Sequence, residues 1–401
     1  MMTEIEKTVF DLIRAAASDL SYEIGGTVDP AALYRIVRRQ HLSAFLWKYA
    51  SRLPDSPVRR AWERDRDLSA LKELTYREEK EKIDRALSEA GIRFLYLKGT
   101  VLKNLWDDPS FRYMGDADFL YEGDDGALHR AFGELGYSAE SYGTRDFSHH
   151  FVFHKDPWFS VEPHFALFDA DSPFAGKLTD LFDRATPDPE LPRRFLISEE
   201  DLYLHTLLHA RKHIANGGIG VRSFLDFVFL LRAYPDLRER ERVRTFVADG
   251  GLGPFEARFL RIVSLFSDPA STPDAEDEEE LSALFSAGLF GSTERSFGNQ
   301  LETESKRSRF PRLRFLFKRA FPPLLSMAHR KFRAPLSWIV YPYYWLRRVF
   351  AMLFSRNRRN NTKASLQAVA SFKENRDVMG RELRYFGISP EEETGEEARR
   401  D

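Results

Sequence analysis

Two aspartates at the start of one apolar run constrain this chain more than any other feature of its sequence. Asp116 and Asp118 flank Ala117 and lead into the apolar run of residues 119–121. Residues two apart on a β-strand project to the same face of the sheet. The two carboxylates are therefore predicted to point together at one cation. Hard divalent ions such as Mg2+ prefer oxygen ligands, and they commonly bind one or two carboxylates together with the phosphates of a nucleotide.

A third acid lies downstream in an apolar, aromatic setting. Glu162 stands between Val161 and Pro163 in the run WFSVEPHFALF, where an unpaired carboxylate would be costly to bury. If its strand lies beside the strand of the two aspartates, three carboxylates converge. A two-metal phosphoryl-transfer site, with ions roughly 3.5–4 Å apart, then becomes feasible. Because Pro163 has no backbone donor, it predicts an edge strand or a strand end.

The segment Lys98-Gly99-Thr100, which follows an apolar run, is a candidate phosphate-binding turn. A glycine permits positive φ and lets the backbone approach a phosphate. The amides at the start of a following helix can bind that phosphate, and Thr100 can serve as N-cap and phosphate contact at once. The alternative interpretation is structural: Gly99 caps a strand, and Lys98 is a solvated lysine at the strand end.

Arg112 lies six residues before Asp118, and its guanidinium offers a bidentate grip on a triphosphate. A solvated surface arginine is the simpler interpretation. The aspartate pair also has a simpler interpretation, because aspartates before a strand are common in turns. The order of the glycine turn, the acid pair and the isolated Glu162 favours a functional site over these alternatives.

Together these residues resemble the DNA polymerase beta-like nucleotidyltransferase superfamily, and within it a bacterial family of uncharacterised nucleotidyltransferases. Three segments in this order support the resemblance: residues 98–100, residues 112–118 and residues 161–164. It covers residues 92–165, and more loosely the stretch 205–213. Glu162 stands where the superfamily usually has aspartate, a difference that the superfamily tolerates.

The resemblance implies transfer of a nucleoside monophosphate from an NTP to an acceptor hydroxyl, with Mg2+ or Mn2+ as cofactor and release of pyrophosphate. Asp116, Asp118 and Glu162 are then the expected catalytic residues and metal ligands. The acceptor is left open among a sugar, a small metabolite, a protein hydroxyl and an RNA end. Two alternatives stay open: a toxin-like transferase that acts on tRNA or protein, and a non-catalytic protein that binds membranes or polyanions through the same fold.

Three histidines, His205, His209 and His213, recur every four residues in a segment that Ser198 is expected to cap. They span about 12 Å along one helix face, so they cannot all bind one ion. His205 is expected to pack, while His209 or His213, with Arg211 or Lys212, is expected to face the cleft. The predicted nucleotide contacts are Lys98, Gly99, Thr100, Arg112, His164, His209 and His213.

The order of elements predicts an α+β fold: a small mixed sheet forms a nucleotidyltransferase core, flanked by N-terminal and C-terminal helical regions. A charged helix over 77–90 leads into a strand over 92–97, and a hairpin is expected around Asp156-Pro157. We divide the chain into four parts: an N-terminal helical region (1–75), the nucleotidyltransferase core (76–190), a helical domain (191–300), and a basic, aromatic helical C-terminal region (301–401) with a disordered tail.

The lack of cysteine excludes disulfides, thiolate metal sites and a cysteine nucleophile. The first sixteen residues, MMTEIEKTVFDLIRAA, are acidic and amphipathic, unlike a secretory signal. A cytoplasmic location is therefore expected.

The net charge of −2 conceals an uneven distribution. Residues 306–363 contain 16 Lys and Arg and no Asp or Glu, so the rest of the chain carries a net charge of −18. This segment is also rich in aromatic residues, a combination that suits peripheral contact with an anionic membrane or with nucleic acid. Its most apolar section, 335–354, is interrupted by Pro342 and Arg347-Arg348 and is too short for a transmembrane helix. Alternatively, the segment docks onto the acidic remainder of the chain.

Overall fold

The computed structural model describes residues 1–139, 149–169, 172–288, 310–320 and 381–388. The predicted disordered tail and most of the basic segment 306–363 lie outside the described residues. The described part of that segment includes helix α14 (Pro311–Ala320).

Three helices open the chain: α1 (Glu4–Ala17), α2 (Pro30–Arg39) and α3 (Trp47–Ala50). The side chain of Thr3 accepts a hydrogen bond from the backbone of Glu6 and forms a capping box at the start of α1. Asp29 caps α2, and Pro30 occupies its first turn, where the missing N–H costs nothing. Gly25 and Gly26 lie in the loop between α1 and α2.

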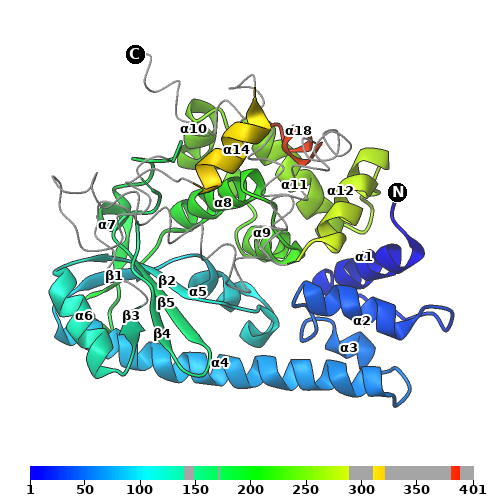
Figure 1. The fold of residues 1–401 in the computed structure, drawn as a ribbon, viewed down its shortest axis with the longest axis horizontal. Coiled ribbons are helices and arrows are strands. Elements are labelled where there is room, and N and C mark those ends of the chain that lie inside the picture. The colour runs from blue at the N-terminus through cyan, green and yellow to red at the C-terminus, as the bar shows by residue number, and fades with distance from the viewer. Residues whose placement is uncertain (140–148, 170–171, 289–309, 321–380, 389–401) are drawn as a thin grey trace.

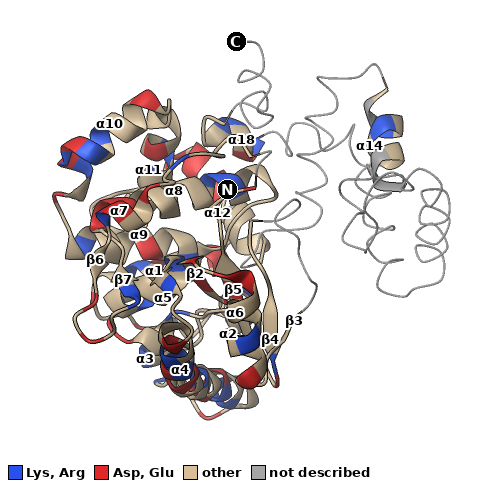
Figure 2. Ribbon diagram, turned by 90° about the vertical axis from the view of Figure 1, so that its left-hand side faces the viewer, with Lys and Arg blue, Asp and Glu red and all other residues tan. Residues whose placement is uncertain are grey.

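Helix α4 (Pro57–Glu89) contains 33 residues and lies along the underside of the molecule in Figure 1. Ser56 caps it by accepting a hydrogen bond from the Arg59 backbone. The chain turns away at Gly91, whose φ is 72°. The helix runs without a break through residue 75, so the N-terminal helical region and the core share one element. Figure 2 views α4 nearly end-on and shows both basic and acidic residues around it.

Seven strands form one mixed sheet in the order β3-β4-β5-β2-β1-β7-β6. The strands are β1 (Arg93–Tyr96), β2 (Ala117–Glu122), β3 (Ser138–Ala139), β4 (Phe153–Lys155), β5 (Phe159–His164), β6 (Thr186–Pro187) and β7 (Arg194–Leu196). β2 pairs with β5 in parallel, β1 pairs with β7 in parallel, and the other pairs are antiparallel. The structure confirms the predicted α+β class with a mixed sheet.

Pro163 lies near the end of β5, which is one of the two positions predicted for it, although β5 is not an edge strand because it lies between β4 and β2. The Pro163 carbonyl accepts a hydrogen bond from the Phe151 backbone at 2.9 Å. One detail of the sheet differs from the predicted core: the sheet continues past residue 190, since β7 pairs with β1. The predicted hairpin around Asp156-Pro157 is present as β4 and β5.

Short helices connect the strands, and longer ones follow the sheet. The connecting helices are α5 (Lys98–Leu102), α6 (Asp125–Glu134) and α7 (Leu181–Arg184). Those that follow the sheet are α8 (Glu199–Ala215), α9 (Val221–Ala233), α10 (Glu241–Asp249), α11 (Gly253–Ser267), α12 (Ala275–Ser286) and α18 (Arg381–Tyr385). Ser198 caps α8 as predicted, by accepting a hydrogen bond from the Asp201 backbone.

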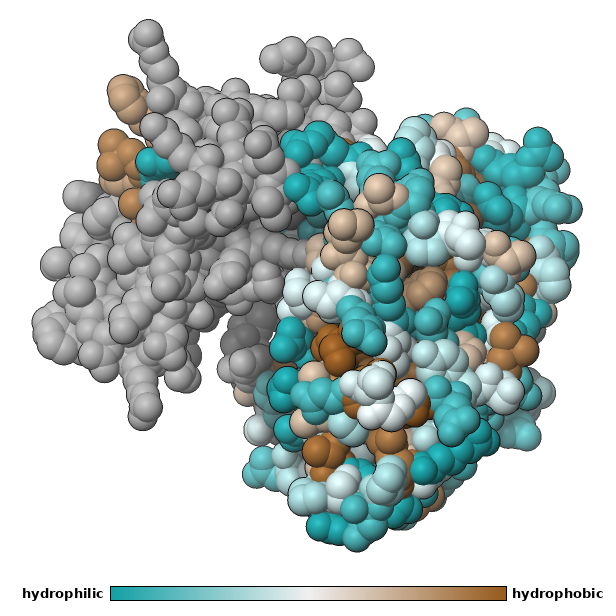
Figure 3. Space-filling model, turned by 90° about the vertical axis from the view of Figure 1, so that its right-hand side faces the viewer, coloured by the Kyte–Doolittle hydropathy of each residue, from teal (hydrophilic) through white to brown (hydrophobic). Residues whose placement is uncertain are grey.

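The sheet separates two apolar cores because side chains alternate along its strands. Phe119 and Tyr121 point into a core with α4 and α6, while Leu120 points into the larger core that includes α8, α9 and α11. Figure 1 shows the same layers, with α4 below the sheet and α8 and α9 above it. Within the described residues, no helix has both the length and the apolar character needed to cross a membrane. On the face shown in Figure 3, the described apolar residues form small separate groups among hydrophilic ones.

Candidate active site

The pairing of β2 with β5 places two of the three predicted acids side by side. Asp118 and Glu162 are direct partners across these parallel strands. Both lie on the face that Leu120 shares, toward α8, and so does His164, two residues after Glu162. One ligand atom from each of Asp118, Glu162 and His164 lies within 4.8 Å of the others. The third predicted acid, Asp116, precedes β2 and is not part of this group of three.

Asp116 stands at the entrance to the same site. Part of its side chain reaches solvent, but the protein packed around it and the negative charge of Asp118 both raise its pKa. A carboxyl with a raised pKa is one that a nearby cation would stabilise in its ionised form. The position of Asp116 therefore fits an additional oxygen ligand at the mouth of the site.

Asp118 is buried and holds two close partners. The Lys98 ammonium and His164 Nε2 each lie 2.9 Å from its Oδ1. Burial alone would raise the pKa of Asp118, but Lys98 and His164 outweigh burial and hold this pKa well below its ordinary range. Asp118 is therefore ionised at neutral pH. Burial conversely lowers the pKa of His164 to about 4, even though Asp118 opposes this shift.

Glu162 differs from Asp118 because, among the described residues, no lysine or arginine forms an ion pair with it. Its Oε2 lies 3.7 Å from His150 Nε2 and 4.0 Å from His164 Nε2. Burial and the charges of Asp118 and Asp116 raise the pKa of Glu162 to about 7. Two neighbouring carboxyl groups with separated pKa values can take different roles in one reaction, one as a fixed charge and one as a proton acceptor.

A cavity of about 360 Å³ opens above these residues, between the sheet and helices α8 and α9. The predicted site residues that line it are Lys98, Gly99, Arg112, Asp116, Asp118, Glu162, His164, His209 and His213. Lys212 from α8 and Arg222 from α9 add positive charge to its wall. The structure therefore brings together nine of the ten residues predicted for the site, and it excludes Thr100.

Thr100 was predicted to be an N-cap and a phosphate contact, and the N-cap prediction is wrong. Helix α5 begins at Lys98, and Leu97 occupies its N-cap position. Thr100 therefore lies inside the helix, with only 3% of its surface exposed. The helix begins early because Lys98 itself takes the positive φ of 43° that turns the chain after β1.

The histidines on α8 divide as the sequence suggested. His205 is fully buried, and its ring lies 6.0 Å from that of Phe168. His209 and His213 line the cavity, with 3.0 Å between their Nε2 atoms. Burial and the charge of Lys98 lower the pKa of His213 to about 4 and that of His209 well below its usual value. Both rings are therefore neutral near pH 7 and able to share a proton in a hydrogen bond.

Gly99 and Arg112, which were both predicted to contact a phosphate, lie against each other. The Arg112 guanidinium is buried and makes a bidentate contact with Asp226 on α9, at 2.6 and 2.7 Å. A Cβ atom on Gly99 would lie only 2.5 Å from Arg112 Nη1. The glycine is thus needed for the approach of Arg112, and the grip predicted on a triphosphate is made on Asp226 instead.

We expect Gly99→Ala to destabilise the protein by about 1–3 kcal/mol, because the added methyl group must displace a guanidinium held in a buried ion pair. Gly133→Ala is the matched control: Gly133 lies in the last turn of α6 with no atom within 4 Å of an added Cβ, so the same change should stabilise by up to about 1 kcal/mol. Chemical denaturation followed by circular dichroism measures both. Equal effects at the two positions would contradict this role for Gly99.

Four residues of the site were missed in the sequence: His149, His150, Arg222 and Asp226. The signal for Asp226 was its place in the otherwise apolar run FLDFVFLL, where a lone acid calls for a buried partner. Arg222 lies one helical turn before it and donates a hydrogen bond to the Tyr113 carbonyl at 2.6 Å. For the histidines, the signal was their adjacency in the sequence, directly before the predicted hairpin.

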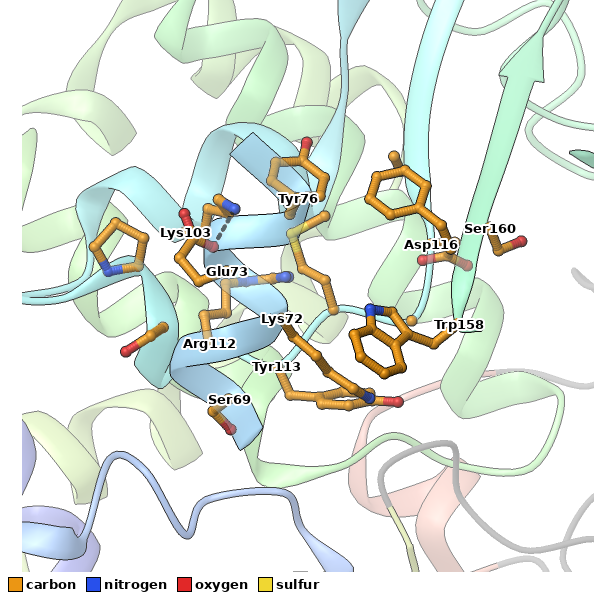
Figure 4. A pocket seen from close by; sticks show the side chains of 16 residues that line it. Ser69, Lys72, Glu73, Tyr76, Lys103, Arg112, Tyr113, Asp116, Trp158 and Ser160 are labelled. Carbon is orange, nitrogen blue, oxygen red and sulfur yellow. Dashed lines mark hydrogen bonds and ion pairs between the residues drawn. The ribbon is translucent and has the colours of Figure 1, made fainter. Parts of the chain in front are cut away.

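A smaller cavity of about 120 Å³ adjoins the first, and Arg112, Met114 and Asp116 line both. Its wall is aromatic and basic. The Lys72 ammonium lies 4.9 Å from the centre of the Tyr113 ring and 6.0 Å from the nearer ring centre of Trp158. Figure 4 shows these three side chains gathered on one side, with Asp116 nearby. Asp116 therefore stands where two cavities of different character meet.

Comparison with known proteins agrees with this geometry. A family model described as "Uncharacterised nucleotidyltransferase" matches residues 26–267. The match includes α4, the whole sheet, and helices α8 and α9, and with them every residue that lines the larger cavity. No curated protein and no solved structure matches the chain.

Proposed function

Because the chain belongs to the uncharacterised nucleotidyltransferase family, we propose that it transfers a nucleoside monophosphate from an NTP to an acceptor hydroxyl in a Mg2+-dependent reaction. One observation carries this proposal. Asp118 and Glu162 lie in register on neighbouring parallel strands, with Asp116 at the head of β2, and all three line one cavity. That cavity also contains lysine and arginine side chains suited to a triphosphate.

The donor set fits a hard divalent cation. Asp116, Asp118 and Glu162 offer carboxylate oxygens, which Mg2+ and Mn2+ both accept. The two contacts of Asp118 involve Oδ1 alone. When bound, the ion would neutralise charge on the triphosphate and lower the pKa of the attacking hydroxyl. Burial, and after it repulsion among the carboxylates, raises the pKa of Asp116 and of Glu162, and that ion would relieve the repulsion.

Three cationic side chains are available to hold the triphosphate: Lys98, Lys212 and Arg222. Lys98 lies closest to the acids and neutralises Asp118 in this structure. Lys212 lies 3.8 Å from Asp169, so its ammonium is only loosely paired. We assign His209 and His213 to the nucleotide or the acceptor as neutral hydrogen-bonding groups. Positioning and charge neutralisation supply most of the catalysis in reactions of this kind.

In the proposed reaction, the acceptor oxygen forms a bond to the α-phosphorus of the NTP. The bond from that phosphorus to the bridging oxygen breaks, and pyrophosphate leaves with that oxygen. Glu162 is suited to take the hydroxyl proton, because a general base works best with a pKa near the working pH. The position of Asp116 between the two cavities suits a donor nucleotide on one side and an acceptor on the other.

The acceptor class decides between the principal proposal and its alternatives. A small molecule, a protein hydroxyl and an RNA end would all use the same acids, and the last two correspond to a toxin-like transferase. A non-catalytic protein that binds membranes or polyanions would not need Asp116, Asp118 and Glu162 to converge. Cytoplasmic location, and contact with lipid or nucleic acid through residues 306–363, stay predictions.

Incubation of the protein with α-labelled NTPs and a cell extract tests the proposal. Label should move to a small molecule, a protein band or an RNA band, which names the acceptor class. Asp116→Asn should reduce transfer by more than about 100-fold, the upper end of what the loss of a residue outside the metal shell costs. The variant should stay folded, because Asp116 is exposed and has a raised pKa. If no labelled product forms, or if Asp116→Asn labels as much product as the parent protein, the alternative of a non-catalytic protein that binds membranes or polyanions is supported instead.

A further inference from the structure

Three histidines gather beside the carboxylates without a role in the proposed reaction. His149 and His150 precede β4, and His164 ends β5. Their ring centres lie 4.4 Å, 5.2 Å and 5.0 Å apart. One nitrogen atom of each ring lies within 4.8 Å of the other two. The chain has ten histidines, and these three meet in the wall of one cavity.

The backbone fixes this group in place. His150 and His164 form an antiparallel bridge. The Phe165 backbone N–H donates to the His149 carbonyl at 3.0 Å, and the Phe151 N–H donates to Pro163. The segment before β4 is thus held against the end of β5. The three rings meet because of the sheet and not through the chance rotation of surface side chains.

Two of the three rings are oriented by carboxylates. His149 Nδ1 lies 2.5 Å from Asp169 Oδ1, and His164 Nε2 lies 2.9 Å from Asp118 Oδ1. In each ring this leaves the second nitrogen for another partner. Histidines that bind metal ions almost always donate their other ring N–H to a carboxylate, a carbonyl or water.

One of these second nitrogens has no partner. His164 is buried, with 1% of its surface exposed, and its Nδ1 makes no hydrogen bond within the described part of the chain. A buried polar atom without a partner costs free energy. His149 Nε2 lies 3.2 Å from His150 Nδ1, and one nitrogen of His164 lies within 4.8 Å of a nitrogen of each of these two rings.

We infer that His149, His150 and His164 form a binding site for a borderline divalent transition-metal ion such as Zn2+. Imidazole nitrogen suits Zn2+, Co2+ and related ions, whereas Mg2+ prefers oxygen. Three protein ligands leave a fourth position for water or a substrate atom, the arrangement of catalytic zinc sites. The site adjoins the carboxylates that the proposed function requires, because His164 also lies within 4.8 Å of Asp118 and Glu162. The two sites differ in their ligands: imidazole nitrogen in this one, and carboxylate oxygen in the proposed Mg2+ site. The inference does not depend on nucleotidyl transfer, because metal binding can be measured without nucleotide.

Cobalt provides the test, since Co2+ in a histidine site absorbs visible light. The full chain is stripped with a chelator and titrated with Co2+ in excess Mg2+, followed by visible absorption and calorimetry. We expect one Co2+ per chain, displaced by Zn2+. His149→Ala should weaken binding by more than about 100-fold, and Asp169→Asn, which removes only the orienting carboxylate, by about 10–100-fold.

Two control variants distinguish a metal site from a hydrogen-bonded chain of histidines. His154 is an exposed residue of β4 and does not belong to the group of three histidines. His154→Gln should therefore bind Co2+ like the parent protein. Asp116→Asn should also keep Co2+ binding while it loses transfer, so failure of the proposed function and failure of this inference give different results. The absence of Co2+ and Zn2+ binding by the parent chain, or unchanged binding in both folded His149→Ala and Asp169→Asn, would show that the three histidines form only a hydrogen-bonded chain.

Discussion

Asp118→Asn is expected to abolish nucleotidyl transfer and to destabilise the protein at the same time. The loss of activity should exceed about 100-fold, because the change removes a proposed metal ligand rather than a residue that supports one. The loss of stability has a separate cause. The Lys98 ammonium is largely buried and pairs with Asp118, and removal of one partner of a buried pair costs about 3 kcal/mol or more.

Comparison with Asp116→Asn separates the loss of stability from the loss of activity. Both substitutions remove one carboxylate from the same site, but only Asp118 is paired with the Lys98 ammonium and has a lowered pKa. In the absence of metal, Asp118→Asn should therefore unfold at lower denaturant concentration than Asp116→Asn. If the two variants unfold together, the pair of Lys98 with Asp118 does not stabilise the fold.

The difference in the free energy of unfolding between the parent protein and Asp118→Asn should shrink as the pH falls. A carboxyl with a folded-state pKa below its unfolded value of 3.8 stabilises the protein above that pH. This contribution disappears as pH falls through the folded pKa. The parent protein and Asp118→Asn should consequently differ fully at pH 6 and approach each other below about pH 4. A difference that grows in acid would contradict the pKa shift.

Asp226→Ala should produce the largest loss of stability, about 3–5 kcal/mol, because it leaves the buried Arg112 guanidinium without a partner. It would also remove the acceptor for Trp106 Nε1, which lies 3.0 Å from Asp226 Oδ1. Chemical denaturation followed by circular dichroism gives the relative stabilities. Asp236→Ala is a matched control, because Asp236 makes an exposed pair with Arg240, and such pairs contribute about 0–1 kcal/mol.

A double variant tests whether the unpaired charge causes this loss. Arg112→Met with Asp226→Leu replaces both charges by apolar groups, so no buried charge is left unpaired. It should be more stable than Asp226→Ala alone, since a buried ion pair contributes little net free energy relative to an apolar replacement. If Asp226→Ala lies within about 1 kcal/mol of the parent protein, water must reach Arg112 and the cavity wall is more open than this structure indicates.

The sequence revealed the acid site because its signals are local. Side chains alternate between the two faces of a β-strand, and this rule predicted the orientation of Asp118. The position of Glu162 in an apolar run predicted a partner across the sheet. The partner of Arg112 is 114 positions away, and no local rule selects one buried acid among those on distant helices. The close approach of Arg112 to Gly99 was missed for the same reason, because the two residues lie thirteen positions apart in the sequence.

Other differences had a signal in the sequence itself. After Pro57 there is neither glycine nor proline before Gly91, so nothing in the sequence ends a helix at residue 75. Thr100 looked like a helix start because Ser and Thr favour N-caps, but the turn after β1 was made by Lys98 in a conformation that lysine rarely adopts.

Because α4 is one continuous helix, the directions of its side chains near its start fix the directions of its side chains near its end. Near one end, Trp62 is buried and donates a hydrogen bond to the Ser43 carbonyl at 2.8 Å. Farther along, Glu73 pairs with Lys103 at 2.5 Å, and Asp84 contacts Tyr96 and Arg194 in the sheet. One residue inserted between Trp62 and Glu73 would turn every later side chain by about 100°. Insertions or deletions in this stretch are therefore tolerable only in steps near a whole helical turn, whereas the loop around Gly25 can change length one residue at a time.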